Sequence, residues 1–160
     1  MNLDDPKVWN ALRSGELTTD VPVCADASVQ FIGTISTPWE TPQDCPKRGD
    51  ETAGPICFVE IVPHLAPALA GLLPGDRLQL LYWLHLSQRD LLLQSPRSDG
   101  EVRGTFALRS PQRPNPIASS FVRLVDIDGT TLSVRGLVCV RGTPLLDIKS
   151  EFGHLNGVSI

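Results

Sequence analysis

The segment from Arg109 to Ile117 is the part of the chain best suited to ligand chemistry, because it carries two arginines and an asparagine among three prolines. Each proline removes a backbone donor, so the segment can be neither a helix nor a central strand. The sequence therefore predicts a stiff loop in which Arg109, Arg113 and Asn115 have little freedom to move. A guanidinium binds a carboxylate or a phosphate through two parallel hydrogen bonds, which makes this loop a candidate ligand site.

The four cysteines and three histidines are the other candidates for chemistry. No CxxC pair occurs and histidine is scarce, so we expect no metal site. Cys57 and Cys139 lie in apolar runs typical of a core. Cys45 lies in a polar loop beside two cations that could lower the pKa of its thiol, although an exposed, inert thiol is an open alternative. His85 comes where an apolar run ends, either as a site residue or only as a strand-end residue.

The elements that must position these residues are mainly strands. Apolar runs predict strands over 29–36, 56–62, 78–86, 104–109, 119–127 and 131–140. Asp128-Gly129 predicts a hairpin turn, His64–Leu72 a short surface helix, and Asp5–Gly15 a short N-terminal helix. Because strands do not alternate regularly with helices, the pattern favours an all-β barrel or sandwich over a doubly wound α/β fold.

Length, charge and missing motifs narrow the class of protein further. The 160 residues suit one domain, which we expect at 29–150, with an N-terminal extension over 1–28 and a tail over 151–160. The net charge of −4 gives no general affinity for nucleic acid, and no apolar run is long enough to cross a membrane. Acidic residues stand where a signal peptide would be basic, which favours the cytoplasm. GxGxxG and P-loop motifs are absent from the sequence.

A set of sequence motifs occurs in one order along the chain. They are Ile32–Ile35 with Pro38-Trp39, Asp44–Arg48, Leu81–His85, Gly104–Pro111, Arg113–Ile117 and Gly142–Lys149. Together they resemble the TrmO/TsaA (YaeB-like) family of S-adenosylmethionine-dependent tRNA methyltransferases. The resemblance implies a small, non-Rossmann β-barrel with short peripheral helices that works as a homodimer. It also implies S-adenosyl-L-methionine as cofactor, and as substrate the exocyclic amino group of the threonylcarbamoyl-modified adenosine 3′ of the tRNA anticodon.

The same resemblance implies site residues. Its cofactor contacts correspond to Pro46, Lys47, Arg48, His85, Leu86, Arg109, Ser119, Val138, Cys139, Val140 and Arg141. Asn115 and Arg113 are candidate catalytic residues: Asn115 either orients the adenine amino group or only ties the loop to itself, and Arg113 binds a carboxylate or an RNA phosphate. Asp147 and Lys149 are candidate substrate residues, with Asp147 accepting from ribose hydroxyls or pairing with an arginine. We expect the arginine loop and the Asp147 segment to line one pocket.

The chain departs from the family pattern at positions that matter. Family members carry acidic residues where this chain has Val138 and Arg141, a glycine where it has Ala118, and a polar residue at Leu86. Arg141 inverts a charge beside the expected cofactor pocket, which can change affinity several-fold. Two alternatives to a tRNA methyltransferase therefore stay open. One is an enzyme of the same fold that methylates a small molecule, and the other is a cofactor-binding module that has lost catalysis.

Overall fold

The computed structural model describes residues 11–21 and 25–151, and they form two compact units. Unit 1 combines the described part of residues 1–28 with residues 84–117, and unit 2 combines residues 29–83 with 118–151. Each unit is described by itself. Most of the helix expected over Asp5–Gly15 lies outside the described residues, which show a turn at 14–15. No helix in the described ranges is long and apolar enough to cross a membrane.

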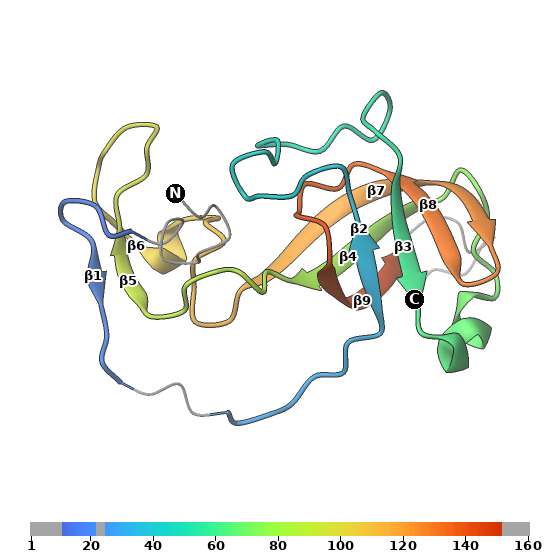
Figure 1. The fold of residues 1–160 in the computed structure, drawn as a ribbon, viewed down its shortest axis with the longest axis horizontal. Coiled ribbons are helices and arrows are strands. Elements are labelled where there is room, and N and C mark those ends of the chain that lie inside the picture. Colours follow the sequence, from blue (N-terminus) through green and yellow to red (C-terminus); the bar gives the residue numbers. More distant parts are fainter. Residues whose placement is uncertain (1–10, 22–24, 152–160) are drawn as a thin grey trace. The chain divides into compact units, whose positions relative to one another are not determined.

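Unit 2 contains a closed six-stranded barrel with the strand order β2-β3-β8-β7-β4-β9 (Figure 1). Its strands are β2 (Gly33–Ser36), β3 (Cys57–Ile61), β4 (Arg77–Trp83), β7 (Ile117–Asp128), β8 (Thr131–Arg135) and β9 (Thr143–Ser150). The small all-β barrel expected from the sequence is thus confirmed. So is the hairpin at Asp128-Gly129, where Gly129 takes the positive φ of 58° that a tight turn between β7 and β8 requires.

Alternation along the strands builds the core of the barrel. In β3 and β4 every second side chain points inward and is almost fully buried, while its neighbours face outward. The inward set includes Ile35, Val59, Leu80, Tyr82, Leu132 and Leu145. The sequence predicted β4 as a central strand, and it does lie between β7 and β9. The sequence also predicted an apolar, covered outer face, but the outward-facing side chains of β4 are only half-buried.

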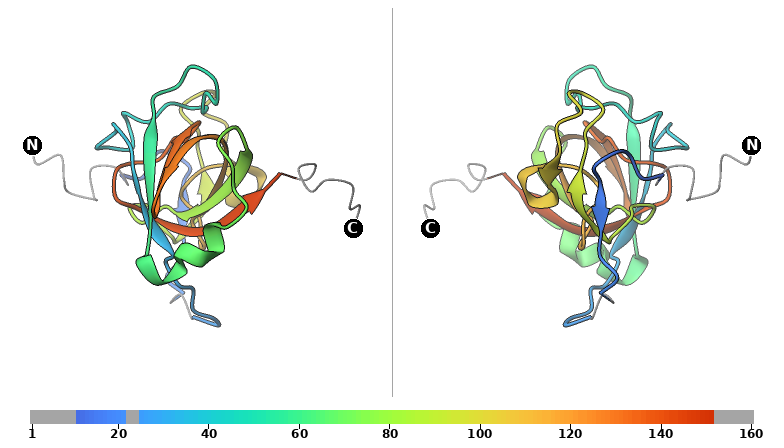
Figure 2. Two further views of the ribbon diagram at one scale, coloured as in Figure 1. Left: turned by 90° about the vertical axis from the view of Figure 1, so that its right-hand side faces the viewer. Right: turned by 90° about the vertical axis from the view of Figure 1, so that its left-hand side faces the viewer.

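Several elements of unit 2 differ from their expected limits. The strand expected over 29–36 begins only at Gly33, and the strand expected over 78–86 ends at Trp83. The helix expected over His64–Leu72 is a 3₁₀ helix, η1 (Pro63–Leu69), because Pro67 inside it lacks the N–H that a regular α-helix needs. It lies beside the ends of β3 and β9 in both views of the barrel (Figures 1 and 2). The strand expected over 131–140 ends at Arg135, because Gly136 turns the chain with a φ of 114°.

Unit 1 contains a three-stranded sheet with the order β1-β5-β6. Its strands are short: β1 (Leu17–Thr18), β5 (Leu91–Gln94) and β6 (Arg103–Gly104). The strand expected over 104–109 is wrong, since β6 ends at Gly104 and a 3₁₀ turn, η2 (Thr105–Ala107), follows. The reason is the hydroxyl of Thr105, which donates to the carbonyl of Leu91 and draws the chain into a turn.

Candidate functional site

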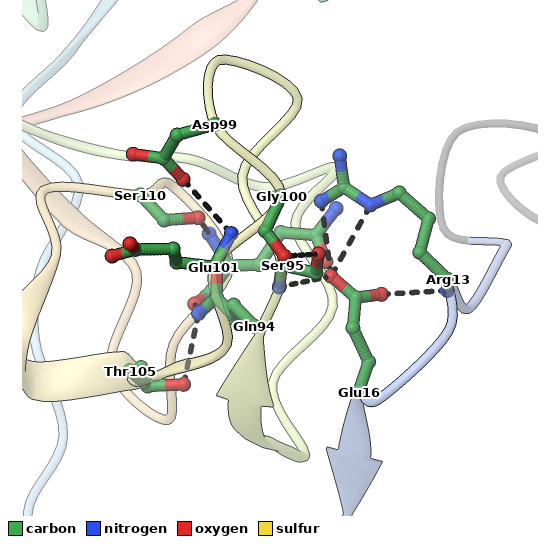
Figure 3. Close-up of polar contacts among 10 residues, drawn as sticks. Arg13, Glu16, Gln94, Ser95, Asp99, Gly100, Glu101, Thr105 and Ser110 are labelled. Carbon is green, nitrogen blue, oxygen red and sulfur yellow. Dashed lines mark hydrogen bonds and ion pairs between the residues drawn. The ribbon is translucent and has the colours of Figure 1, made fainter.

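The loop from Arg109 to Ile117, here called the proline-braced loop, is anchored on a buried amide. Gln94 is only 3% exposed, and its Nε2 donates to Thr105 Oγ1 at 2.8 Å and to the carbonyl of Gln112 at 2.7 Å. Figure 3 shows the Gln94 amide pointing at Thr105. Both donors of one buried amide are therefore used to fix this loop to η2, since leaving either unpaired would cost free energy.

The segment 84–89 lies beside the proline-braced loop. The backbone N–H of Leu84 donates to the carbonyl of Pro116 at 2.8 Å, and Arg89 Nε donates to the carbonyl of Pro114 at 2.7 Å. The structure thus brings the expected cofactor residues of this segment, His85 and Leu86, next to the loop that carries the arginines and the asparagine. His85 is exposed and Leu86 is half-buried.

The two arginines and the asparagine of the proline-braced loop have different environments. Arg113 is half-buried, and its Nη2 donates to the carbonyls of Leu108 at 2.7 Å and Thr105 at 3.3 Å, so it holds the loop backbone. Asn115 is exposed, and its Oδ1 lies 3.5 Å from an Arg89 nitrogen. Arg109 is exposed and forms no recorded hydrogen bond or ion pair with the described residues. Of the two loop arginines, Arg109 is the one free to bind an anion.

A second cluster lies in unit 2, where residues 37–49 pack against residues 136–142; we call these segments the loop pair. Thr37 Oγ1 donates to the carbonyl of Cys139 at 2.7 Å, and Arg141 N–H donates to the carbonyl of Trp39 at 2.8 Å. Gly49 lies so close to Gly136 that a Cβ at Gly49 would overlap the Gly136 carbonyl oxygen. The loop pair therefore brings the expected cofactor residues Pro46, Lys47 and Arg48 together with Val138, Cys139, Val140 and Arg141.

The charge of Arg141 is offset by a residue that the sequence analysis missed. Arg141 Nε lies 2.9 Å from Glu40 Oε1 on the facing loop. Glu40 directly follows the Pro38-Trp39 motif, which is the signal that would have drawn attention to it. Lys47 and Arg48 are exposed on the same loop. The loop pair thus presents both signs of charge, which suits a ligand that carries both.

The cysteines correct one expectation and confirm another. Burial and the nearby Asp44 carboxylate raise the pKa of the Cys45 thiol to about 11, so the lowering expected from its cationic neighbours is wrong. The thiol is half-buried and donates to the carbonyl of Thr41. Cys57 and Cys139 are free and buried, as predicted, and burial raises the pKa of Cys139 to about 12.

The remaining expected site residues lie on the outer face of the barrel. Gln79 donates to Ser119 Oγ at 2.8 Å and is the register partner of Lys149. Lys149 Nζ lies 2.6 Å from Asp147 Oδ2, so Asp147 pairs with this lysine rather than with an arginine. The Asp147 side chain is 46% exposed. Because Asp147 and the proline-braced loop belong to different units, the single pocket expected from the sequence stays a prediction.

Asp147 also lines a cavity of about 290 Å³. Apart from Asp147 and Ser150, its walls are aliphatic: Ile32, Ile61, Leu65, Ala68, Leu69, Leu72 and Ile148. Three leucines of the wall come from η1 and the residues that follow it. Since these lining residues include no arginine or lysine, the cavity offers no cation to a phosphate.

The closed barrel and its loops define a protein of the tRNA-methyltransferase O class. Residues 34–154 match the model of the tRNA-methyltransferase O N-terminal domain, and the chain belongs to that family. A relative in Rhizobium radiobacter, the probable S-adenosyl-L-methionine-binding protein VirR, is 49% identical over 140 residues, which is 88% of this chain and 79% of the relative. A probable S-adenosyl-L-methionine-binding protein of Methanothermobacter thermautotrophicus is 34% identical over 130 residues, 81% of this chain and 93% of the relative.

Solved structures give the same class. A crystal structure of TrmO superposes with a TM-score of 0.66 at 28% identity over 84% of this chain and 62% of that one. The TrmO of Pseudomonas aeruginosa superposes with a TM-score of 0.62 at 28% identity, over 84% of this chain and 60% of that one. The chain therefore spans about 60% of the length of the TrmO structures that it matches.

Proposed function

We propose that the chain is a methyltransferase that uses S-adenosyl-L-methionine and acts on tRNA. In the finer form of the proposal, the acceptor is the exocyclic amino group of the threonylcarbamoyl-modified adenosine 3′ of the anticodon. The observation that carries the proposal is the family match over residues 34–154. The match includes every motif on which the resemblance depends, except Ile32 and Gly33 at the start of the first motif. The resemblance is also the reason to expect a homodimer.

The residue types at the candidate site fit this cofactor. The methionine part of S-adenosyl-L-methionine carries a carboxylate, for which Arg109, Lys47 and Arg48 are exposed cations. Its ammonium and sulfonium charges need oxygen atoms, and Glu40 offers a carboxylate on the loop pair. The relatives named as S-adenosyl-L-methionine-binding proteins support the same cofactor for this chain.

The roles of the residues follow from the demands of methyl transfer. When bound, the cofactor supplies a methyl group on a positively charged sulfur: the sulfur–methyl bond breaks to leave a neutral thioether, the nitrogen–methyl bond forms, and the acceptor nitrogen releases one proton to water. The acceptor nitrogen must lie in line with that bond, so positioning is the main contribution of the protein. We assign the positioning of the adenine amino group to Asn115, on the exposed side of the proline-braced loop. Arg113 keeps that loop in place through two backbone carbonyls.

The test combines cofactor binding with methyl transfer. Isothermal titration with S-adenosyl-L-methionine measures binding, and transfer of a labelled methyl group to bulk tRNA from cells that lack the family enzyme measures activity. We expect binding, labelling of tRNA, and a methylated threonylcarbamoyl adenosine after nuclease digestion. Absence of cofactor binding would refute the proposal, while labelling of another nucleoside would refute only its finer form.

A cofactor-binding module without methyl transfer is the second candidate. The feature that favours it is Arg141, which stands where the resemblance implies an acidic residue beside the expected cofactor contacts. The two relatives are named for binding S-adenosyl-L-methionine and not for methyl transfer. Cofactor binding with no labelled product from tRNA or from a pool of cellular small molecules would favour this candidate.

A further inference from the structure

Phe106 is the most exposed large apolar side chain among the described residues, with 86% of its surface accessible. It lies in the middle of η2, the 3₁₀ turn from Thr105 to Ala107. A single exposed apolar side chain is ordinary on a protein surface, so exposure alone does not mark a site. Phe106 differs because buried hydrogen bonds anchor the turn that carries it and polar residues follow it.

The exposure of Phe106 is fixed by the structure around it. The preceding residue, Thr105, is only 3% exposed; it donates to the Leu91 carbonyl at 2.7 Å and accepts from Gln94. The following turn is held by Arg113, which donates to the Leu108 carbonyl at 2.7 Å. With anchors on both sides, the backbone that carries the ring is held in place, because breaking these hydrogen bonds would cost free energy.

The residues that follow Phe106 in this turn and loop are mostly polar. Arg109, three positions along, is exposed and unpaired with the described residues, and Asn115 is exposed on the same anchored loop. An exposed ring accompanied by arginine is the combination with which proteins bind single-stranded RNA: bases stack on the ring and the guanidinium contacts a phosphate or a base. A protein interface favours a contiguous apolar core around its aromatic anchor. Next to Phe106 in η2 are only the buried Thr105 and the small Ala107.

We propose that Phe106 is a stacking platform for an unpaired RNA base, with Arg109 contacting the adjoining backbone. This inference rests on the proposed function, because it takes tRNA as the partner. It adds a positioning residue that holds the RNA rather than the cofactor. An exposed ring on an anchored turn suits this role because little conformational entropy is lost when a base stacks on it.

The experiment compares substitutions at Phe106 that separate the π-face from apolar bulk. Binding of bulk tRNA is measured by fluorescence anisotropy at one fixed salt concentration, with Phe106→Ala, Phe106→Leu and Phe106→Trp. We expect the alanine and leucine variants to bind about tenfold more weakly and Phe106→Trp to bind like the wild type. In Phe106→Trp, the extra tryptophan fluorescence should be quenched by tRNA. Cofactor affinity and melting temperature should not change in any variant.

Phe58→Ala is the matched control, since Phe58 is 46% exposed on β3 of unit 2 and should leave tRNA binding unchanged. If the wild type binds tRNA and Phe106→Ala binds it equally well, this inference is overturned and the proposed function stands. No tRNA binding by the wild type would overturn both. A leucine variant that binds tRNA as the wild type does, together with an alanine variant that loses self-association on sedimentation, would instead place Phe106 against a second copy of the chain.

Discussion

Glu40 and Arg141 form an ion pair across the loop pair, with 2.9 Å between Glu40 Oε1 and Arg141 Nε. The Arg141 backbone also donates to the carbonyl of Trp39, so the two segments are joined by the main chain as well as by charge. Arg141 places a cation beside the expected cofactor contacts, and a carboxylate from the facing loop offsets it. Both side chains are more than half exposed, so the pair adds little to stability and its effect should appear in ligand binding.

The first prediction follows from that pair. Glu40→Gln leaves the charge of Arg141 unopposed, so the affinity for the cationic S-adenosyl-L-methionine should fall about two- to fivefold. S-adenosylhomocysteine, which lacks the sulfonium charge, should lose less. Titration calorimetry of both ligands with wild type, Glu40→Gln and Arg141→Gln measures the difference. Equal losses for the two ligands would show that Glu40 does not act through its charge.

A second prediction concerns the contact between Gly49 and Gly136. A Cβ at Gly49 would overlap a backbone oxygen of Gly136, which a backbone can relieve only by moving. Gly49→Ala should therefore separate the loop pair, lower the melting temperature by roughly 3–6 °C and weaken cofactor binding at least tenfold. Gly71→Ala is a matched control for binding, because a Cβ there has no neighbour within 4 Å. Because Gly71 has a positive φ, its replacement by alanine should lower the stability of the protein but not its affinity for the cofactor.

The barrel was predictable because its strands alternate in sequence as they do in the sheet. The sequence predicted β3 and β7 nearly at their observed limits, and the Asp128-Gly129 turn predicted that β8 follows β7 in a hairpin. β1 and β5 have two and four residues, too few for a periodic signal, and they are defined by their pairing within the sheet β1-β5-β6. β9 was not predicted from the sequence. The register of β9 against β4 shifts between Leu81 and Tyr82, and this bulge breaks the alternation by which the strand could have been predicted.

The site was predictable at the level of segments but not of side-chain contacts. The motifs led to the proline-braced loop and to both parts of the loop pair, since their residues are local in sequence. The side-chain contacts depend on the fold: Arg113 donates to the carbonyl of Leu108, and Arg141 pairs with Glu40. The half-burial of Cys45 depends on the fold as well. Burial outweighs the nearby cations at Cys45, and no sequence pattern states how deeply a loop residue is buried.

A third prediction tests the buried anchor of the proline-braced loop. Thr105→Val removes the hydroxyl that donates to Leu91 and accepts from Gln94, leaving two buried polar groups unpaired. The free energy of unfolding should fall by about 1–3 kcal/mol in urea titrations, and amide exchange should accelerate within residues 105–116. Thr34→Val, at an exposed position of β2, makes the same chemical change and should alter stability by less than about 0.5 kcal/mol. Equal effects of the two substitutions would contradict the anchoring role.

A fourth prediction concerns acid stability. Arg77 pairs with Glu51 at 2.7 Å and with Glu151 at 2.5 Å, and its guanidinium lies 4.2 Å from the centre of the Phe121 ring. The hydrogen bonds from Arg77 lower the pKa of Glu51, so the folded state favours the ionised carboxylate. That stabilisation is present at neutral pH and is lost as the pH falls through the lowered, folded-state pKa of Glu51.

Glu51→Gln should therefore lower the melting temperature by roughly 2–4 °C at pH 7 and by progressively less as the pH falls, because protonation of Glu51 weakens the same interaction in the wild type. Thermal unfolding of both proteins across this pH range measures the difference. Glu60→Gln is the comparison, since Glu60 is exposed on β3 and pairs with no described residue through an ion pair. A difference between wild type and Glu51→Gln that persists unchanged at pH 3 would assign the effect to packing rather than to charge.

The fifth prediction concerns the reactivity of Cys45. With its pKa raised to about 11, only about a thousandth of this thiol is ionised at pH 8, and the thiolate is the reactive form. Iodoacetamide should therefore modify Cys45 roughly a hundredfold more slowly than a free cysteine at pH 8, and the rate should keep rising toward pH 11. Peptide mapping by mass spectrometry follows the modification residue by residue. Asp44→Asn removes the carboxylate that helps to raise the pKa, so it should speed the reaction, whereas a slower reaction would show that Asp44 acts by shaping the loop.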